Sequence, residues 1–270
     1  MAFGQGFYKA RMDNPQTLIV GRGAYARDIA YLSDKPAKPA GTSLFWLSGF
    51  MSDMASTKAT ALTDFAASHG VGYTRFDYSG HGRSGGDFKQ GTIGRWLEEA
   101  RAVFTQVTQG PQIIIGSSMG GHIALLLLKT LQRDDSEAAS RVKALVLIAP
   151  AWDMTEELMW KKFSQEIRDE IQSQGYHLRP SAYDAPYTIT RDLIEDGRKH
   201  LLAREPFDPG CPVVIIQGAQ DVDVPAAHTR ELLNFLKGKD VRLIEIADGE
   251  HRLSRPQDLD RLYREIESVM

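Results

Sequence analysis

The sequence predicts an α/β protein in which helices cover both faces of a mostly parallel sheet. Short β-rich runs recur along the 270 residues, and segments with helical periodicity lie between them. Several of these runs are apolar at nearly every position, which is typical of strands that are buried on both faces of a parallel sheet. Strands that alternate with helices in this way indicate a doubly wound arrangement.

The expected strands begin with "RDIAYL" and continue with more apolar runs such as "QIIIGS" and "PVVIIQG". In chain order they cover residues 27–32, 43–49, 72–78, 112–117, 143–150, 212–218 and 241–247. Helical patterns fall between or after them, at residues 56–68, 92–108, 121–132, 226–238 and 256–269. Most of these strands are thus joined through a helix, as parallel neighbours require.

Residues 151–210 break this rhythm, because they separate two expected strands by far more than one helical crossover. Apolar residues spaced by four predict an amphipathic helix here, with Asp153 as its N-cap and Glu156 three residues later. That helix would carry Met159, Phe163, Ile167 and Ile171. The core of the protein would then comprise residues 1–150 and 211–270.

The same segment is rich in aromatic residues, namely Trp152, Trp160, Tyr176, Tyr183 and Tyr187. Ligands of open α/β sheets bind beyond the carboxyl ends of the strands, where such an insertion would lie. We therefore expect residues 151–210 to form a helical lid, or cap, inserted after the strand at residues 143–150 and covering a site at those strand ends. A decorative insertion without a role at the site is the alternative.

Composition argues against several classes of protein. The formal net charge of −3 at pH 7 provides no basic field for nucleic acid. Cys211 is the single cysteine, which rules out an internal disulfide and a cysteine-based zinc site. The longest purely apolar stretches, such as residues 123–128, are far shorter than the roughly 20 residues that span a bilayer. Stable membrane insertion is therefore not expected.

The start of the chain, residues 1–14, contains no apolar h-region and does not resemble a secretory signal. We accordingly expect a cytoplasmic protein. The sequence leaves the oligomeric state open.

The stretch Gly116-Ser117-Ser118-Met119-Gly120 matches the G-x-S-x-G motif. It follows an expected strand and leads directly into an apolar helix, which is the context of a nucleophile elbow. The flanking glycines allow a tight strand-to-helix turn and the close approach of neighbouring backbone. This turn projects the central side chain, so Ser118 is the expected nucleophile, and the hydroxyl of Ser117 is expected to be structural.

A serine hydroxyl needs a base within hydrogen-bond reach. Proteins with a nucleophile elbow have the chain order serine, acid, histidine, which places the base late in the sequence. This order sets aside His69, His81, His122, His177 and His200. His228 lies within a helical pattern, whereas His251 lies in a glycine-containing loop between the last strand and the last helix. His251 is therefore the expected base.

The acid must fix the tautomer of the histidine and stabilise the imidazolium that forms. Two aspartates compete for this role in "IIQGAQDVDVP". Asp221 lies three residues beyond Gly218, which ends a strand, on the loop that faces the expected site. Asp223 lies just before a helical pattern, where the helix N-terminus favours a carboxylate. Asp221 is the expected acid, and Asp223 is the alternative.

Acyl transfer also requires hydrogen-bond donors for the developing oxyanion. The backbone N–H of Met119, next to the nucleophile, is expected to be one of them. The other should come from the loop after an earlier strand, and "LFWLSGFMSDM" offers the N–H of Phe50. The glycine-rich loop around His81 lacks the spacing and the lysine of a phosphate-binding loop. We expect His81 to hold this loop by hydrogen bonds rather than to act as a base.

With these residues assigned, the sequence resembles an α/β-hydrolase from end to end. The segments "LSGF", "FDYSGHGRSGG", "GSSMGGH", "QGAQDVDVP" and "DGEHR" occur in the order of that family. The resemblance implies an α/β-hydrolase fold, with Ser118, Asp221 and His251 as the catalytic triad. It also implies Phe50 and Met119 as oxyanion-hole residues. Ser48 precedes the glycine of the oxyanion loop, where many α/β-hydrolases have a histidine.

The sequence is similar in particular to the group of α/β-hydrolases typified by α/β-hydrolase domain-containing protein ten. This similarity is carried by "SGFMSDMASTKA", "TRFDYSGHGRSGG", "GPQIIIGSSMGG" and "DVDVPAAHT", and by "SAYDAPYTIT" in the expected lid. The group comprises acyl-protein thioesterases that also hydrolyse acyl glucuronides of drugs. Its mitochondrial members carry a transit peptide, which we do not recognise in this sequence.

We therefore expect a serine hydrolase that cleaves carboxylic esters or thioesters through an acyl-enzyme, with no cofactor and no metal. Its substrate would be a small molecule or an acylated protein. C–C bond hydrolysis and peptide hydrolysis on the same fold are alternatives, because they use the same triad. A small-molecule binding protein with slow turnover is another, since one fold can host receptors as well as enzymes.

Overall fold

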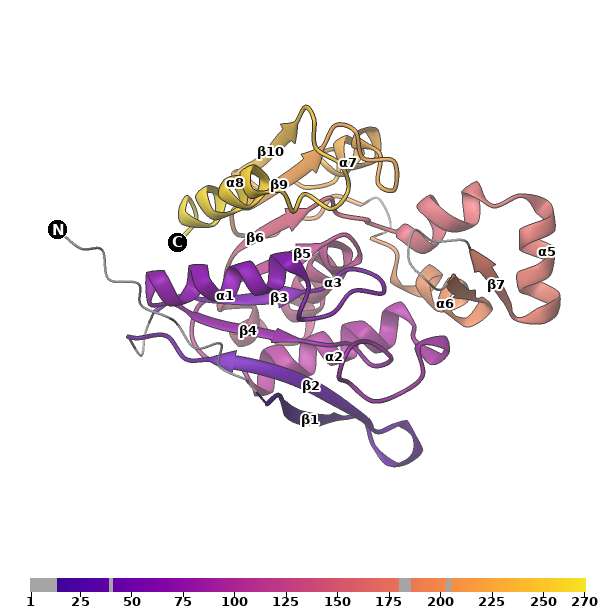
Figure 1. The fold of residues 1–270 in the computed structure, drawn as a ribbon, viewed down its shortest axis with the longest axis horizontal. Coiled ribbons are helices and arrows are strands. Elements are labelled where there is room, and N and C mark those ends of the chain that lie inside the picture. The colour runs from indigo at the N-terminus through magenta and orange to yellow at the C-terminus, as the bar shows by residue number, and fades with distance from the viewer. Residues whose placement is uncertain (1–13, 39–40, 180–185, 203–204) are drawn as a thin grey trace, which may run out of the picture.

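An eight-stranded sheet forms the centre of the computed structural model, which describes residues 14–38, 41–179, 186–202 and 205–270 (Figure 1). The strands are β1 (Gln16–Val20), β2 (Arg27–Asp34), β3 (Ser43–Leu47), β4 (Gly72–Phe76), β5 (Gln112–Ser117), β6 (Val142–Ile148), β9 (Val213–Gly218) and β10 (Val241–Ile246). Their order across the sheet is β1-β2-β4-β3-β5-β6-β9-β10. The six strands from β4 to β10 in this order pair in parallel, whereas β1 and β2 are antiparallel to their neighbours.

Helices cover both faces of this sheet. Helices α1 (Thr57–His69) and α8 (Pro256–Glu267) pack on one face, where their apolar side chains join Leu44 and Trp46 of β3 in one core cluster. Helices α2 (Ile93–Gln106), α3 (Met119–Asp134), α4 (Ser136–Ser140) and α7 (Ala226–Leu232) pack on the other, with Phe45 and Leu47 of β3. Every residue of β3 is buried. The prediction of a doubly wound sheet with strands buried on both faces is confirmed.

The strands and helices expected in the core are all present, and several end a few residues earlier than expected. Helix α7, for example, ends at Leu232, and the chain then turns until Leu236 bridges to Phe207. The sequence did not predict β1, which pairs with β2 across a short loop that contains the 3-10 turn η1 (Gly23–Tyr25). The small edge hairpin thus adds to the parallel core without changing its order.

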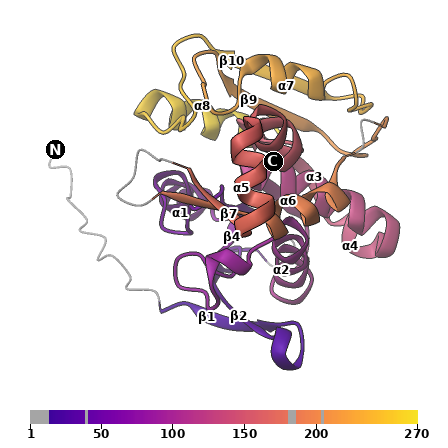
Figure 2. The same ribbon diagram turned by 90° about the vertical axis from the view of Figure 1, so that its right-hand side faces the viewer.

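Most of the described part of segment 151–210 lies beyond the carboxyl ends of the strands, and its buried residues join the core cluster of α2 and α3 (Figures 1 and 2). The inserted segment contains the π-helical turn η3 (Thr155–Met159), the 3-10 turns η4 (Trp160–Lys162) and η5 (Arg198–His200), α5 (Gln165–Gln174), α6 (Arg191–Gly197), and a hairpin of β7 (Tyr176–Arg179) and β8 (Tyr187–Thr190). Tyr183 lies outside the described residues.

The single amphipathic helix expected from residue 153 onward is wrong in detail. Phe163 is extended, with φ −72° and ψ 140°, and ends η4. Helix α5 begins anew after Ser164, whose hydroxyl accepts a hydrogen bond from the N–H of Ile167. Ser164 therefore acts as an N-cap, and a capping serine inside an otherwise continuous apolar pattern starts a second helix.

Candidate active site

The loop between β5 and α3 has the geometry of a nucleophile elbow. Ser118 has φ 54° and ψ −117°, a backbone conformation that non-glycine residues rarely adopt. The surrounding chain holds it there, because the N–H of Ser118 donates to the carbonyl of Ile148 at 2.8 Å. The carbonyl of Ser118 in turn accepts from the N–H of Gly121 at 2.9 Å and of Ala151 at 3.0 Å.

The two motif glycines are required by close backbone approach. A Cβ atom at Gly116 would lie 2.3 Å from the carbonyl oxygen of Gly120. A Cβ atom at Gly120 would lie 2.0 Å from the carbonyl oxygen of Leu47, at the end of β3. Both separations are shorter than any van der Waals contact. The turn can therefore form only with glycine at these positions, which leaves Ser118 at its apex and Ser117 buried.

The structure brings Ser118, His251 and Asp221 together at the carboxyl ends of β5, β9 and β10. Nδ1 of His251 lies 2.7 Å from Oδ2 of Asp221, and Nε2 lies 3.1 Å from Oγ of Ser118. A carboxylate only accepts hydrogen bonds, so Nδ1 carries the proton and Nε2 presents its lone pair to the serine hydroxyl. Asp221 is buried, whereas His251 is partly open to solvent.

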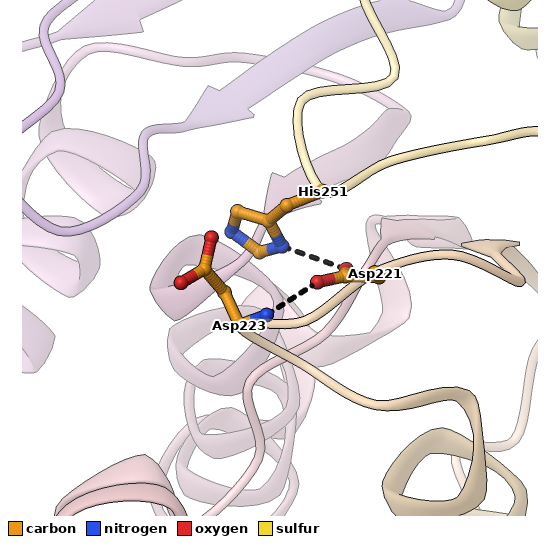
Figure 3. Close-up of side chains that lie close together, drawn as sticks. All are labelled: Asp221, Asp223 and His251. Atoms are coloured by element: carbon orange, nitrogen blue, oxygen red, sulfur yellow. Dashed lines mark hydrogen bonds and ion pairs between the residues drawn. The ribbon is translucent and has the colours of Figure 1, made fainter. Parts of the chain in front are cut away.

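Asp223 does not take the position of Asp221, although it lies close to the same imidazole. Figure 3 shows the Asp221 carboxylate bonded to Nδ1 of His251 and the Asp223 carboxylate beside the other ring nitrogen. Oδ1 of Asp221 also accepts the N–H of Asp223 at 2.9 Å and of Val224 at 2.8 Å. The buried aspartate therefore organises its own loop as well as the histidine.

Gln217, near the end of β9, supports Asp221 and was not singled out from the sequence. Its Nε2 donates to Oδ2 of Asp221 at 3.3 Å and to the carbonyl of Val224 at 3.0 Å. Its Oε1 accepts from the hydroxyl of Thr229 at 2.6 Å. The available signal was a lone polar residue inside the apolar run "PVVIIQG", because a glutamine that is fully buried needs partners for its amide.

The loop after β3 approaches Ser118 closely. A Cβ atom at Gly49 would lie 3.4 Å from Cβ of Ser118, so this loop lies against the elbow. Among the described residues, none accepts a hydrogen bond from the N–H of Phe50 or from that of Met119. The N–H of Met119 is one of the free donors that begin helix α3.

His81 contacts the loop after β3 rather than Ser118. The N–H of Met51, a residue at φ 53°, donates to Nε2 of His81 at 3.2 Å, and Nδ1 donates to the carbonyl of Ser79 at 3.2 Å. Trp96 donates to the same carbonyl at 3.3 Å. Burial lowers the pKa of His81, so the ring stays neutral and keeps Nε2 as an acceptor. The prediction that His81 holds loops by hydrogen bonds is confirmed.

An aromatic cluster joins this loop to the inserted segment. The ring of Phe50 lies 5.1 Å from that of Phe88, 6.0 Å from that of Trp96 and 5.9 Å from that of Tyr187 at the start of β8. Edge-on contacts at these separations are favourable for aromatic pairs. The side chain of Phe50 thus connects the loop after β3, which lies against Ser118, with Tyr187 of the inserted segment.

His122, one turn into α3, binds Asp153, which in turn binds the other end of the inserted segment. Its Nδ1 accepts the N–H of Asp153 at 3.2 Å, and Oδ1 of Asp153 accepts the N–H of Leu202 at 2.8 Å. Burial lowers the pKa of His122 to about 3, with smaller contributions from His200 and His228. A neutral His122 is therefore the acceptor that joins the segment to α3.

Asp221, Asp223 and His251 offer three ligand atoms within 4.8 Å of one another, which is a spacing that a metal ion could use. The hydrogen bonds of Asp221 do not suit that role. Its Oδ1 accepts two backbone N–H groups, and its Oδ2 accepts from His251 and Gln217. Since each carboxylate oxygen has two lone pairs, neither has one left for a metal. The arrangement fits a hydrogen-bonded triad instead.

Helices in the described part of the chain are all too short or too polar to cross a bilayer.

Comparisons with known proteins agree with this fold. The model of a family described as serine aminopeptidase, S33, matches residues 40–195. The protein named mitochondrial palmitoyl-protein thioesterase ABHD10 from Bos taurus is 30% identical over 248 residues, which cover 90% of this chain and 78% of that protein. The Homo sapiens protein of the same name is 29% identical over the same length.

Two solved structures are similar over nearly the whole chain. A putative hydrolase from Agrobacterium vitis has a TM-score of 0.92 and 45% identity, and the match covers 95% of this chain and 98% of that one. The α/β-hydrolase domain-containing protein 10 from mouse has a TM-score of 0.79 and 28% identity, with 94% and 97% covered.

The expected cytoplasmic location is wrong, because the similar curated proteins are named as mitochondrial. An apolar h-region marks secretory signals only, so its absence from residues 1–14 says nothing about other targeting segments. Mitochondrial transit peptides are amphipathic and arginine-rich, so a search for apolar length does not detect them. Residues 1–13 lie outside the described part of the chain.

The expected resemblance is thus confirmed by a family model that covers more than half of the chain and by relatives that align with most of it. The structure adds a sheet and an elbow of the same type. The chain belongs to the α/β-hydrolase family, as one of its serine hydrolases.

Proposed function

We propose that this protein hydrolyses acyl thioesters and esters through an acyl-enzyme on Ser118. The observation that carries the proposal is the pair of distances at His251, 3.1 Å from Nε2 to Oγ of Ser118 and 2.7 Å from Nδ1 to Oδ2 of Asp221. A serine, a base within reach and an acid that orients the base are the parts that activate a nucleophile.

In the first half-reaction, Oγ of Ser118 attacks the acyl carbon while Nε2 of His251 takes the hydroxyl proton. The resulting imidazolium is stabilised by Asp221, which stays ionised and keeps the ring in place. The tetrahedral intermediate then collapses, the bond to the leaving sulfur or oxygen breaks, and His251 donates its proton to that atom. Water repeats the sequence on the acyl-enzyme and releases the carboxylic acid.

The N–H groups of Phe50 and Met119 would bind the oxyanion in both half-reactions. Support comes from the loop after β3, which lies against Ser118, and from the lack of another acceptor for either N–H within the described residues. Donors that are already oriented stabilise charge in the transition state without reorganisation. They contact the carbonyl oxygen rather than the leaving atom, so they serve a thioester as well as an ester.

An acylated substrate is supported by the names of the relatives, which are palmitoyl-protein thioesterases. The acylated group of this protein's substrate would be carried by a small molecule or by a protein. We further propose that residues 151–210 act as the lid and that residues 1–150 and 211–270 form the catalytic core. The contact of Tyr187 with Phe50 and the anchoring of Asp153 by His122 support a lid that stays close to the elbow.

The test is a substrate panel on the wild type and on Ser118→Ala. It would include an S-hexanoyl thioester, p-nitrophenyl hexanoate and an aminoacyl p-nitroanilide. We expect turnover of the thioester and of the ester, and a loss of at least about a thousandfold in Ser118→Ala. Cleavage of the anilide alone would indicate a peptidase. Tight binding of the esters without turnover would indicate a binding protein.

A further inference from the structure

The loop that supplies Asp221 carries a second carboxylate, that of Asp223. Asp221 binds Nδ1 of His251, whereas Asp223 lies on the side of the ring that carries Nε2. Asp223 is exposed, and one of its carboxylate oxygens lies within 4.8 Å of a ring nitrogen of His251. Figure 3 shows this carboxylate beside Nε2, the nitrogen that is not bonded to Asp221. The backbone of Asp223 is held in place, because its N–H donates to Oδ1 of Asp221 at 2.9 Å.

No cation among the described residues neutralises this carboxylate. The hydrogen bond of Asp223 is made by its backbone, and no ion pair in the described part of the chain involves its side chain. The adjacent Val222 is 87% exposed, and the exposed residues on either side of His251, Glu250 and Arg252, carry opposite charges, so Asp223 is the charge that remains beside the ring. The approach to Nε2 therefore has a negative charge that solvent screens only in part.

The leaving group must pass beside this charge. When the tetrahedral intermediate collapses, the acyl–sulfur bond breaks, the electron pair goes to sulfur, and the proton on Nε2 of His251 transfers to it. General acid catalysis requires the leaving atom to lie within hydrogen-bond distance of Nε2. A charged group on the leaving thiol, a few bonds from its sulfur, would then be close enough to interact electrostatically with the carboxylate of Asp223.

We propose that Asp223 selects leaving groups by charge, favouring cationic ones and disfavouring anionic ones. This inference rests on the proposed function, because it needs His251 as the proton donor. The substrate class that it favours is an acylated peptide with lysine or arginine beside the acylated cysteine. Acidic carriers of the acyl group, such as thiols with phosphate or carboxylate groups, are disfavoured.

The experiment compares hexanoyl thioesters that share the acyl group and differ in the charge of the thiol. Thiocholine is cationic, 2-methoxyethanethiol is neutral, and 2-mercaptoethanesulfonate is anionic. At low salt we expect the wild type to prefer the cationic over the anionic thioester in kcat/KM by about tenfold. Asp223→Asn should reduce this ratio about threefold or more, and Asp223→Lys should invert it.

Salt and a matched control variant separate a local effect from a global one. Raising the ionic strength to 1 M shortens the Debye length to about 3 Å, so the preference of the wild type should shrink toward that of Asp223→Asn. Asp260→Asn, an exposed position on α8, changes the net charge equally and should keep the wild-type ratio.

An unchanged ratio in Asp223→Asn, or an equal loss in Asp260→Asn, would overturn the inference while leaving the proposed function intact. Failure of the wild type to hydrolyse even the neutral thioester would instead contradict the proposed function itself. The two failures are therefore distinguishable within one set of assays.

Discussion

Trp152 and His228 bind each other through both their rings and their backbones. The rings are stacked at 4.4 Å with an interplanar angle of 11°. Nε1 of Trp152 donates to the carbonyl of His228 at 2.8 Å, and Nε2 of His228 donates to the carbonyl of Trp152 at 2.9 Å. This pair joins the first residues of the inserted segment to α7, which follows the loop of Asp221 and Asp223.

The pair makes the fold sensitive to acid. Burial lowers the pKa of His228 to about 4, and burial lowers that of His122 to about 3, whereas both are near 6.5 in an unfolded chain. Between these values the unfolded chain binds more protons than the folded one. The free energy of unfolding should therefore be highest above pH 6.5 and should fall as the pH decreases toward 4.

Denaturant unfolding at pH 7.5, 6 and 5 would measure this dependence. His228→Phe keeps an aromatic ring but cannot titrate or donate to Trp152. We expect it to be less stable at pH 7.5 by about 1 kcal/mol and to show a shallower loss in acid. Parallel curves for the wild type and His228→Phe would mean that this histidine does not contribute to the acid sensitivity.

A fluorophosphonate probe should label one residue, Ser118. Such probes react with a serine that is activated by a neighbouring base, and only Ser118 lies within hydrogen-bond distance of Nε2 of His251 in the described part of the chain. Ser118→Ala should abolish labelling with an unchanged circular dichroism spectrum. Ser117→Ala is the matched control and should keep most of the labelling. Persistent labelling without Ser118 would contradict the elbow assignment.

Asp221→Asn should lose far more activity than Asp223→Asn. An asparagine at 221 can present an N–H to Nδ1 and so stabilise the wrong tautomer of His251, a change that costs roughly ten thousandfold in a serine protease. The measurement is kcat for the neutral thioester at pH 7.5 in both variants. Equal losses, or the reverse order, would transfer the acid role to Asp223.

His81→Phe should lower kcat by about ten- to a hundredfold with little change in KM. The variant removes the acceptor for the N–H of Met51, which lets the loop that carries the Phe50 N–H move away from the oxyanion. A boronic acid that mimics the tetrahedral intermediate should lose affinity by a similar factor. His69→Phe, on the surface beside Glu267, is the control. A loss confined to KM would argue for a role in substrate binding instead.

Acyl chain length should affect kcat/KM if the lid encloses an apolar pocket above Ser118. Each buried methylene contributes at most about 0.8 kcal/mol, or up to about fourfold in rate, until the pocket is full. Because a lid of about sixty residues must also hold its own core, we expect an optimum at medium chains. Thioesters of two to sixteen carbons would locate it. A steady fall from acetyl upward would indicate a pocket for small acyl groups only.

The meeting of Ser118, His251 and Asp221 could be predicted because each lies in a sequence context with a distinct physical signature. Close backbone contacts allow only glycine at positions 116 and 120, and this requirement is visible in the sequence as the G-x-S-x-G motif. His251 and Asp221 follow strands, so the parallel sheet brings them to one edge. Gln217 and the bond from Met51 to His81 depend on side chains that meet only after folding, and the sequence does not place them.

The inserted segment shows the limit of periodicity. Met159, Phe163, Ile167 and Ile171 keep a spacing of four, yet the helix breaks between Phe163 and Ser164. A periodic apolar pattern indicates which face of a segment is buried. It does not indicate whether the backbone stays helical along the whole segment. The Ser164 cap was the local signal that should have outweighed the pattern, and the short strands β7 and β8 were too polar to be recognised.

The hydrogen bond between Asp153 and Leu202 has a consequence for how this enzyme could diversify. This bond holds the two ends of the inserted segment together beside His122. The points at which the segment leaves and rejoins the core therefore stay close together, however many residues lie between them. The entropic cost of closing a loop rises only slowly with the number of residues inside it. If the segment acts as the proposed lid, the residues between 153 and 202 could be exchanged to change acyl selectivity without altering the sheet that carries Ser118, Asp221 and His251.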